Sequence, residues 1–160
     1  MKTFFSSLIL LSSLALAQDS TDHMRTLNTP RWVIDLFHSS GMDSIYRFSF
    51  RINPSYLRGD FDGDGGTDVV ALITNKAKAY GGFAIFSAKK AKVFIVGADS
   101  VRSDFNRMDV WGVLPKELES RLDIKGAQGE VIYVLRTESE GGGHIYWSGQ
   151  SFLWRKRSSK

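Results

Sequence analysis

Four aspartates recur at short intervals in one stretch of the chain, and no basic residue separates them. Counted from the first, they take positions 1, 3, 5 and 9: Asp60, Asp62, Asp64 and Asp68. Carboxylates held this close repel one another, so a folded loop of this kind needs a cation at its centre. Calcium takes about six to eight oxygen ligands, and a turning backbone brings every second side chain to one point. The spacing therefore predicts a calcium loop in which the main-chain carbonyl of Gly66, at position 7, joins the carboxylates.

The residues around these acids indicate how the loop is held. Gly63, Gly65 and Gly66 allow a tight ring, because glycine reaches positive φ without a Cβ clash. A helix-loop-helix calcium site requires a glutamate at position 12, where this chain has Ala71. The flanking segments favour strands, so we expect a strand-loop-strand clamp.

Residues 59–69, Gly-Asp-Phe-Asp-Gly-Asp-Gly-Gly-Thr-Asp-Val, resemble the D-x-D-G-D-G-x-x-D loop of FG-GAP and VCBS repeats. Those repeats, as in integrin α-subunit propellers, bind calcium through the matching aspartates and a backbone carbonyl. The resemblance implies these ligands here: Asp60, Asp62, Asp64, Gly66 through its carbonyl, and Asp68. The loop occurs in a single copy, whereas a propeller needs several blades, so the propeller fold and adhesion role are not expected. The whole chain also resembles small secreted bacterial proteins with one such loop and a C-terminal Tyr-Trp-x-Gly hairpin.

The N-terminal residues have the pattern of a secretory signal peptide. Lys2 precedes an apolar run, residues 4–17, that ends in Ala-Leu-Ala, and this run is shorter than the roughly 20 residues that span a bilayer. We expect cleavage after Ala17 and a secreted or periplasmic protein without a transmembrane segment; an uncleaved anchor is the alternative. The expected organisation is a signal peptide (1–17), a flexible linker (18–29), one β-rich calcium-loop domain (30–157) and a tail (158–160).

Composition excludes several kinds of site. The chain contains no cysteine, which rules out disulfides, thiol catalysis and thiolate metal sites. Its formal net charge is +4, and four cations lie among the last six residues: Arg155, Lys156, Arg157 and Lys160. The high isoelectric point is therefore a property of the tail, and no nucleic-acid partner is expected.

Outside the loop, the pattern is that of an antiparallel β protein with a short N-terminal helix. Thr29-Pro30 offers a capping hydroxyl and a first-turn proline, and Gly41 ends the helical spacing. Residues 46–52 alternate apolar and polar side chains, which predicts a strand with one solvent-exposed face. Four continuous apolar runs predict strands covered on both faces: residues 69–73, 83–86, 93–96 and 131–135. Because the first of these runs follows the calcium loop, we expect it to be a central strand.

The C-terminal third has weaker signals. Residues 99–129 are interpreted as an ordered loop packed by aromatic side chains, with a short helix opening at Pro115. Residues 144–154 predict a tight hairpin around a three-residue loop, with Tyr146 opposite Trp154. The expected fold is mainly β, a sandwich or half-open barrel of antiparallel strands.

No catalytic constellation is recognisable, so an enzyme is not expected. A G-x-S-x-G nucleophile elbow is absent, and the three histidines are scattered along the chain. Trp111, Trp147 and Trp154 are candidates for stacking on sugars if exposed; filling the core of a disulfide-free domain is the favoured alternative. The first hypothesis is thus a non-catalytic calcium-stabilised interaction module, with an unidentified protein or polysaccharide partner outside the inner membrane. The second is a carbohydrate or cell-wall recognition module.

Overall fold

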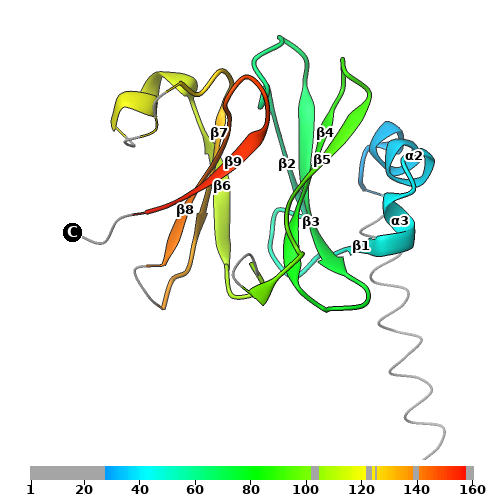
Figure 1. The fold of residues 1–160 in the computed structure, drawn as a ribbon. Helices are drawn as coiled ribbons and strands as arrows, with labels where there is room; N and C mark the ends of the chain where they lie inside the picture. Colours follow the sequence, from blue (N-terminus) through cyan, green and yellow to red (C-terminus); the bar gives the residue numbers. More distant parts are fainter. Residues whose placement is uncertain (1–27, 102–104, 122–123, 125, 139–140, 158–160) are drawn as a thin grey trace, which may run out of the picture.

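Two antiparallel sheets face each other in the computed structural model, which describes residues 28–101, 105–121, 124, 126–138 and 141–157 (Figure 1). The five-stranded sheet contains β1 (Tyr46–Phe48), β2 (Tyr56–Gly59), β3 (Asp68–Asn75), β4 (Gly81–Ser87) and β5 (Lys92–Gly97). The four-stranded sheet contains β6 (Val110–Leu114), β7 (Val131–Leu135), β8 (Gly142–Trp147) and β9 (Phe152–Lys156). The remaining elements are α2 (Arg31–Ser39), α3 (Met42–Ile45) and the 3-10 helix η2 (Lys116–Arg121). The predicted mainly β fold is confirmed, and it takes the sandwich form.

The core is divided into layers by the five-stranded sheet. Between the two sheets, Leu72 of β3 and Phe83 of β4 pack with Ile132 of β7 in one buried cluster. On the other side of the first sheet, Val69 and neighbouring apolar residues pack against Phe37 of α2. Strands β3 and β4 are therefore buried on both faces, which explains their continuous apolar sequences.

Strand β3 occupies the central position predicted for it. It pairs with β4 along one edge, while β1 and β2 share its other edge. β2 pairs with the half of β3 that leaves the acidic loop, and β1 pairs with the far half. Strands β3, β4 and β5 follow one another as a meander of antiparallel hairpins.

The strand predicted for residues 46–52 is wrong beyond Phe48, because β1 has only three residues. In one continuous strand Phe48 and Ile52 would share a face, since their spacing is even. Instead Phe48 packs in the helix-side layer, and Ile52 is buried between the sheets. The chain leaves the edge of β3 after β1 and crosses toward the other layer.

The interpretation of residues 99–129 as a loop missed β6. This strand pairs with β7 and includes Trp111, whose side chain enters the core between the sheets. Gly112 interrupts its apolar pattern, since the ring of Tyr133 lies where a side chain at Gly112 would stand. The short helix expected from Pro115 is present as η2.

The C-terminal hairpin is confirmed, but its predicted register is wrong by one residue. Tyr146 is paired with Leu153, and Trp154 is paired with Ile145. A shift of one residue moves side chains to opposite faces of the sheet. Tyr146 consequently packs with Val131 on the outer face, while Trp154 packs against the core between the sheets.

The first helix has the predicted position but not the predicted cap. Pro30 takes the N-cap position of α2, where no side-chain hydrogen bond is made. In the described part of the chain, no helix is both long and apolar enough to cross a membrane. The predicted signal peptide and nearly all of the predicted linker lie outside the described residues.

Candidate metal centre

The acidic loop joins β2 to β3, as the strand-loop-strand prediction requires. The two strands are antiparallel neighbours, and Gly59 is paired with Asp68 at the base of the loop. The loop therefore begins and ends at one point of the sheet, so the aspartates at positions 1 and 9 are brought together. The central position of β3 anchors this base in the buried part of the molecule.

Three of the four predicted carboxylates converge. Asp60, Asp62 and Asp68 each offer an oxygen atom, and these atoms lie within 4.8 Å of one another. Asp62 and Asp68 are buried, and Asp60 is partly exposed. Oδ1 of Asp60 is a buried atom without a hydrogen-bond partner among the described residues. A set of hard carboxylate oxygens with an unsatisfied member fits a metal ion.

Asp68 organises the loop through main-chain hydrogen bonds. Its Oδ2 accepts from the N–H groups of Phe61 (3.1 Å) and Asp62 (3.3 Å), and its Oδ1 accepts from the N–H of Ala88 (3.1 Å). Burial raises the pKa of Asp68 to about 6, and the neighbouring charges of Asp62 and Asp64 act in the same direction. The carboxyl group is thus held in an environment that disfavours its negative charge.

A lysine from another element enters the acidic cluster. Nζ of Lys90, in the turn between β4 and β5, lies 2.7 Å from Oδ2 of Asp62 and 3.7 Å from Oδ2 of Asp64. The hydroxyl of Ser87 donates to the same Asp62 oxygen at 2.6 Å. Burial by itself would raise the pKa of Asp62, but the hydrogen bonds from Lys90 and Ser87 outweigh it and lower the pKa.

Asp64 and Gly66 occupy a different part of the loop. Asp64 is outside the group of three, and its Oδ1 accepts a hydrogen bond from the N–H of Gly66 at 2.8 Å. Lys89 donates to the main-chain carbonyl of Asp64. The assignment of Asp64 and the Gly66 carbonyl as ligands stays a prediction.

Glu130, just before β7, ties the loop to the second sheet. Its Oε2 accepts from the N–H of Asp60 at 2.7 Å, and its own N–H donates to the carbonyl of Asp60 at 2.8 Å. Gly63, at φ +70°, packs so closely on the carbonyl of Gln128 that a Cβ at this position would overlap it. A polar cavity of about 320 Å³ adjoins this junction, and its lining residues include Asp60, Gly63, Lys116, Glu117 and Glu130.

Sequence reasoning missed Lys90 and Glu130 as parts of the site. Both are distant from the loop in sequence, and nothing in their local pattern links them to it. The relevant signal is the meander itself, because pairing β4 with β3 brings the β4–β5 turn to the end of the sheet that carries the loop.

The three candidate tryptophans fill the core, the alternative favoured for them. Trp111 and Trp147 expose only 5% and 7% of their surfaces, and Trp154 packs against the core between the sheets. The ring of Trp147 also has Nζ of Lys90 above it, 5.1 Å from the ring centroid. Trp147 therefore borders the acidic cluster from the second sheet.

No protein-family model matches this chain, and neither curated proteins nor solved structures gave a match. The candidate site is accordingly defined by its own geometry: three convergent carboxylates, a lysine beside them and a glutamate that ties the loop to the second sheet.

Proposed function

We propose that this protein is an exported, non-catalytic calcium-binding domain in which Ca²⁺ stabilises the β2–β3 hairpin. The observation that carries this proposal is the convergence of oxygens from Asp60, Asp62 and Asp68 within 4.8 Å of one another. The domain would act by binding a protein or polysaccharide partner outside the inner membrane. Its similarity to the FG-GAP and VCBS calcium loop supports the same choice of ion.

The chemistry of the donors favours calcium over other divalent metals. The cluster offers only carboxylate oxygens, which suit hard cations, whereas zinc prefers nitrogen and sulfur ligands. Magnesium requires near-ideal octahedral geometry, while calcium accepts the irregular arrangement of a glycine-rich loop. Asp64 and the carbonyl of Gly66 would complete the coordination sphere.

The proposed role of the ion is structural. Asp68 is both a member of the cluster and the first residue of β3, the strand buried on both faces. An ion bound there would offset the repulsion among the loop carboxylates and fix the entry of β3 into the core. Through the Glu130 contacts of Asp60, the stabilisation would extend to the second sheet.

Thermal melting in Ca²⁺ and in EGTA tests this proposal. An ion that binds only the folded state stabilises it by about 2.7 kcal/mol at a hundredfold excess over the dissociation constant. For a chain of this size, such a gain raises the melting temperature on the order of 5–10 °C. Asp60→Asn keeps the shape of the side chain but removes a ligand charge, so we expect it to abolish most of the rise.

The matched control is Asp35→Asn, which removes an exposed acid that forms an ion pair with Arg31 on α2. This variant should retain the full response to Ca²⁺, because α2 lies on the far side of the five-stranded sheet from the second sheet (Figure 1). An unaltered chain that melts at the same temperature in Ca²⁺ and in EGTA would refute the proposal.

A further inference from the structure

The ammonium group of Lys90 already stands where a positive charge is needed. It lies 2.7 Å from Asp62, a member of the convergent group, and 3.7 Å from Asp64, a predicted ligand. The Lys90 side chain is 38% exposed, whereas the Asp62 side chain is wholly buried. The lysine therefore reaches in from the surface and neutralises a buried carboxylate, which would be costly to leave unpaired.

A metal ion in the cluster and this ammonium group would compete for the same carboxylate group, that of Asp62. Calcium binds carboxylate oxygens at about 2.3–2.6 Å, so an ion on Oδ2 of Asp62 would stand in strong repulsion with Nζ of Lys90. The backbone of the β4–β5 turn is at the surface, and a lysine side chain has the rotamer freedom to swing into water. Displacement of the side chain requires no change in the sheet.

We propose that Lys90 is a tethered competitor of the metal: its ammonium group holds the acidic loop closed without metal, and an entering divalent cation displaces it. This inference rests on the proposed calcium site and adds its control. Lys90 sets the affinity, because each ion that binds must break the contacts of the lysine. It also protects the folded loop from its own repulsion at low calcium.

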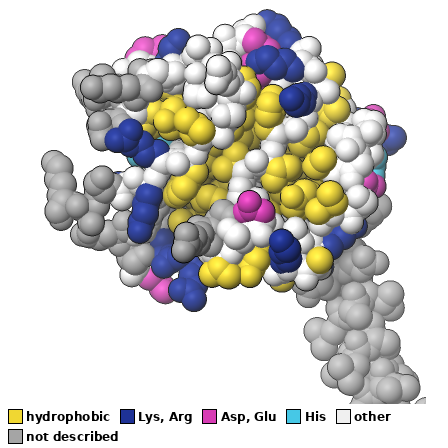
Figure 2. Space-filling model, in the orientation of Figure 1, with side chains coloured by type: hydrophobic (Ala, Val, Ile, Leu, Met, Phe, Trp, Pro, Cys, Tyr) yellow, Lys and Arg dark blue, Asp and Glu magenta, His cyan; other side chains and the backbone are white. Residues whose placement is uncertain are grey.

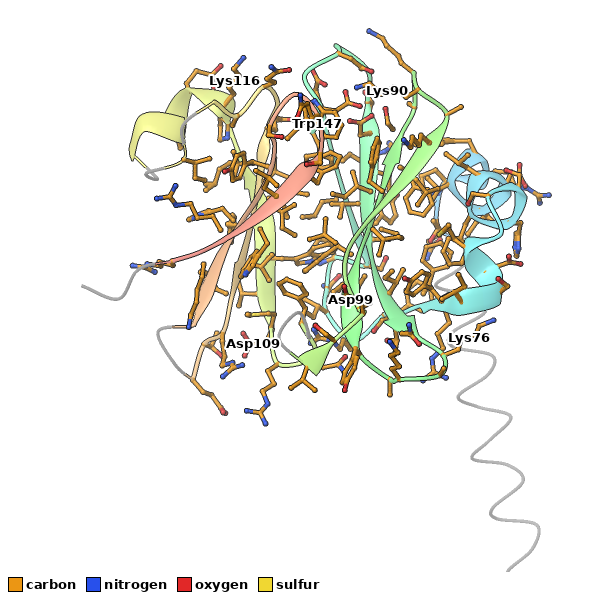
Figure 3. All side chains as sticks on the ribbon, viewed as in Figure 1. Lys76, Lys90, Asp99, Asp109, Lys116 and Trp147 are labelled. Carbon is orange, nitrogen blue, oxygen red and sulfur yellow. The ribbon has the colours of Figure 1, made fainter. Side chains whose placement is uncertain are left out.

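The ring of Trp147 makes a second contact with the ammonium group of Lys90. In the closed state Nζ of Lys90 lies 5.1 Å from the Trp147 ring centroid, an arrangement that attracts the cation to the ring face. Figure 3 shows both side chains at the end of the sandwich that carries the loop, with Lys90 on the first sheet and Trp147 on the second. Trp147 also packs on Phe94 (5.2 Å between centroids) and Phe152 (4.9 Å). Departure of the ammonium group would thus change the surroundings of the Trp147 ring, which belongs to β8 and packs against β5 and β9.

The test measures Ca²⁺ binding by calorimetry in the full chain and in two variants. Lys90→Met removes the competitor; Lys92→Met removes a charge from the same hairpin, where Lys92 lies over the ring of Phe94. We expect Lys90→Met to bind Ca²⁺ about three- to tenfold more tightly than the unaltered chain, since the ion no longer displaces a cation. Lys92→Met should change the affinity by less than about twofold, because long-range surface charge is screened. Lys90→Arg keeps the competing charge and should keep the weaker affinity.

Fluorine NMR of protein labelled with 5-fluorotryptophan reads the displacement directly. The chain has four tryptophans, and Trp147→Phe assigns the resonance of interest. Ca²⁺ should shift the Trp147 resonance in the unaltered chain and in Lys92→Met, but not in Lys90→Met, where no ammonium group leaves the ring. Melting adds a third measurement: Lys90→Met should melt below the unaltered chain in EGTA, and this difference should vanish in saturating Ca²⁺.

The outcomes separate this inference from the proposed function. Equal Ca²⁺ affinity in the unaltered chain and Lys90→Met, with a Trp147 resonance that Ca²⁺ does not move, would overturn the role of Lys90 and leave the calcium site standing. Binding of Ca²⁺ by Lys90→Met and not by the unaltered chain would overturn both the inference and the proposed function, because the lysine would then exclude the ion instead of being displaced by it. Absence of Ca²⁺ binding in both chains would overturn the proposed function and this inference with it.

Discussion

At the scale of single residues, the loop carboxylates differ in the cations and hydrogen-bond donors that contact them. Asp68 is satisfied by three main-chain N–H groups, and Asp62 is satisfied by Lys90 and Ser87. Asp60 differs, because its Oδ2 accepts from Gly65 at 2.9 Å while its buried Oδ1 has no partner among the described residues. Asp60 therefore keeps one carboxylate oxygen that an ion could engage without displacing another hydrogen bond.

A histidine away from the loop links stability to pH. His144 lies on the outer face of the four-stranded sheet, paired with Tyr133 on β7 and Arg155 on β9. Burial lowers its pKa below 6.5, and the charge of Arg157 lowers it further. The His144 ring is therefore protonated more readily in the unfolded chain than in the folded one. The contribution of neutral His144 to the free energy of unfolding is fully present above about pH 6.5, and it is lost as the pH falls from there toward the folded-state pKa.

We expect His144→Gln to remove part of the decrease in unfolding free energy between pH 7 and pH 5. Urea unfolding of both chains at intervals across this range gives the comparison. Parallel pH profiles for His144→Gln and the unaltered chain would contradict the prediction.

At the scale of elements, the β2–β3 hairpin combines a sequence-encoded loop with a contact the loop sequence does not show. Gly63 has φ +70°, a conformation that other residues adopt only with strain. It also packs against the carbonyl of Gln128, close enough that any side chain would collide with it. The loop conformation is thus fixed both from within and by the segment before β7.

Gly63→Ala should destabilise the protein more than its φ angle alone explains. The positive φ costs about 1 kcal/mol for alanine, and the collision with Gln128 forces a further shift of the loop. Gly126→Ala is a matched control, because Gly126 has φ +85° and nothing within 4 Å of the added Cβ. We expect a loss of about 2–4 kcal/mol at Gly63 and about 1 kcal/mol at Gly126, measured by urea unfolding. Equal losses at the two positions would show that the close packing of Gly63 contributes nothing.

How far the sequence predicts these elements depends on the kind of signal each carries. β3 and β4 are predictable because burial on both faces leaves continuous apolar runs. β6 is hidden because it is short and carries Gly112 beneath the Tyr133 ring, a contact visible only across strands. The acids of the loop follow from local spacing, whereas Lys90 and Glu130 reach the site through tertiary pairing. The convergence of Asp60, Asp62 and Asp68 was therefore predictable from local spacing, and the contacts of the loop with Lys90 and Glu130 were not.

At the scale of the whole molecule, the loop and its surroundings bridge the two sheets at one end of the sandwich. Glu130 contacts the loop from the second sheet, and Lys90 contacts Trp147 from the first. Strands β5 and β9 approach each other along one side of the sandwich, where the rings of Phe94 and Phe152 pack with 5.3 Å between their centroids. Hydrophobic side chains are visible over this side of the molecule (Figure 2). The sheets are thus joined by apolar contacts along their length and by polar contacts at the loop.

Removing the hydrogen bond between Asp60 and Glu130 should lower the unfolding free energy of the whole sandwich. Glu130→Ala leaves the N–H of Asp60 without its acceptor, and a hydrogen bond to a charged group contributes roughly 1.5–3 kcal/mol. Because Glu130 is partly exposed, we expect a loss of about 1–2 kcal/mol in urea unfolding. Glu117→Ala removes an exposed acid that lines the same cavity, and its effect should stay within about 0.5 kcal/mol.

The same pair of variants tests whether calcium acts across both sheets. In the unaltered chain, Ca²⁺ should slow amide hydrogen exchange at residues 60–70 and also at residues 130–134 of the second sheet, since Glu130 and Asp60 exchange hydrogen bonds in both directions. In Glu130→Ala, protection should persist at residues 60–70 and fall at residues 130–134, while Glu117→Ala should behave as the unaltered chain. Protection at residues 130–134 that survives Glu130→Ala would mean that the sheets are coupled through the apolar layer between them and that the loop adds no connection of its own.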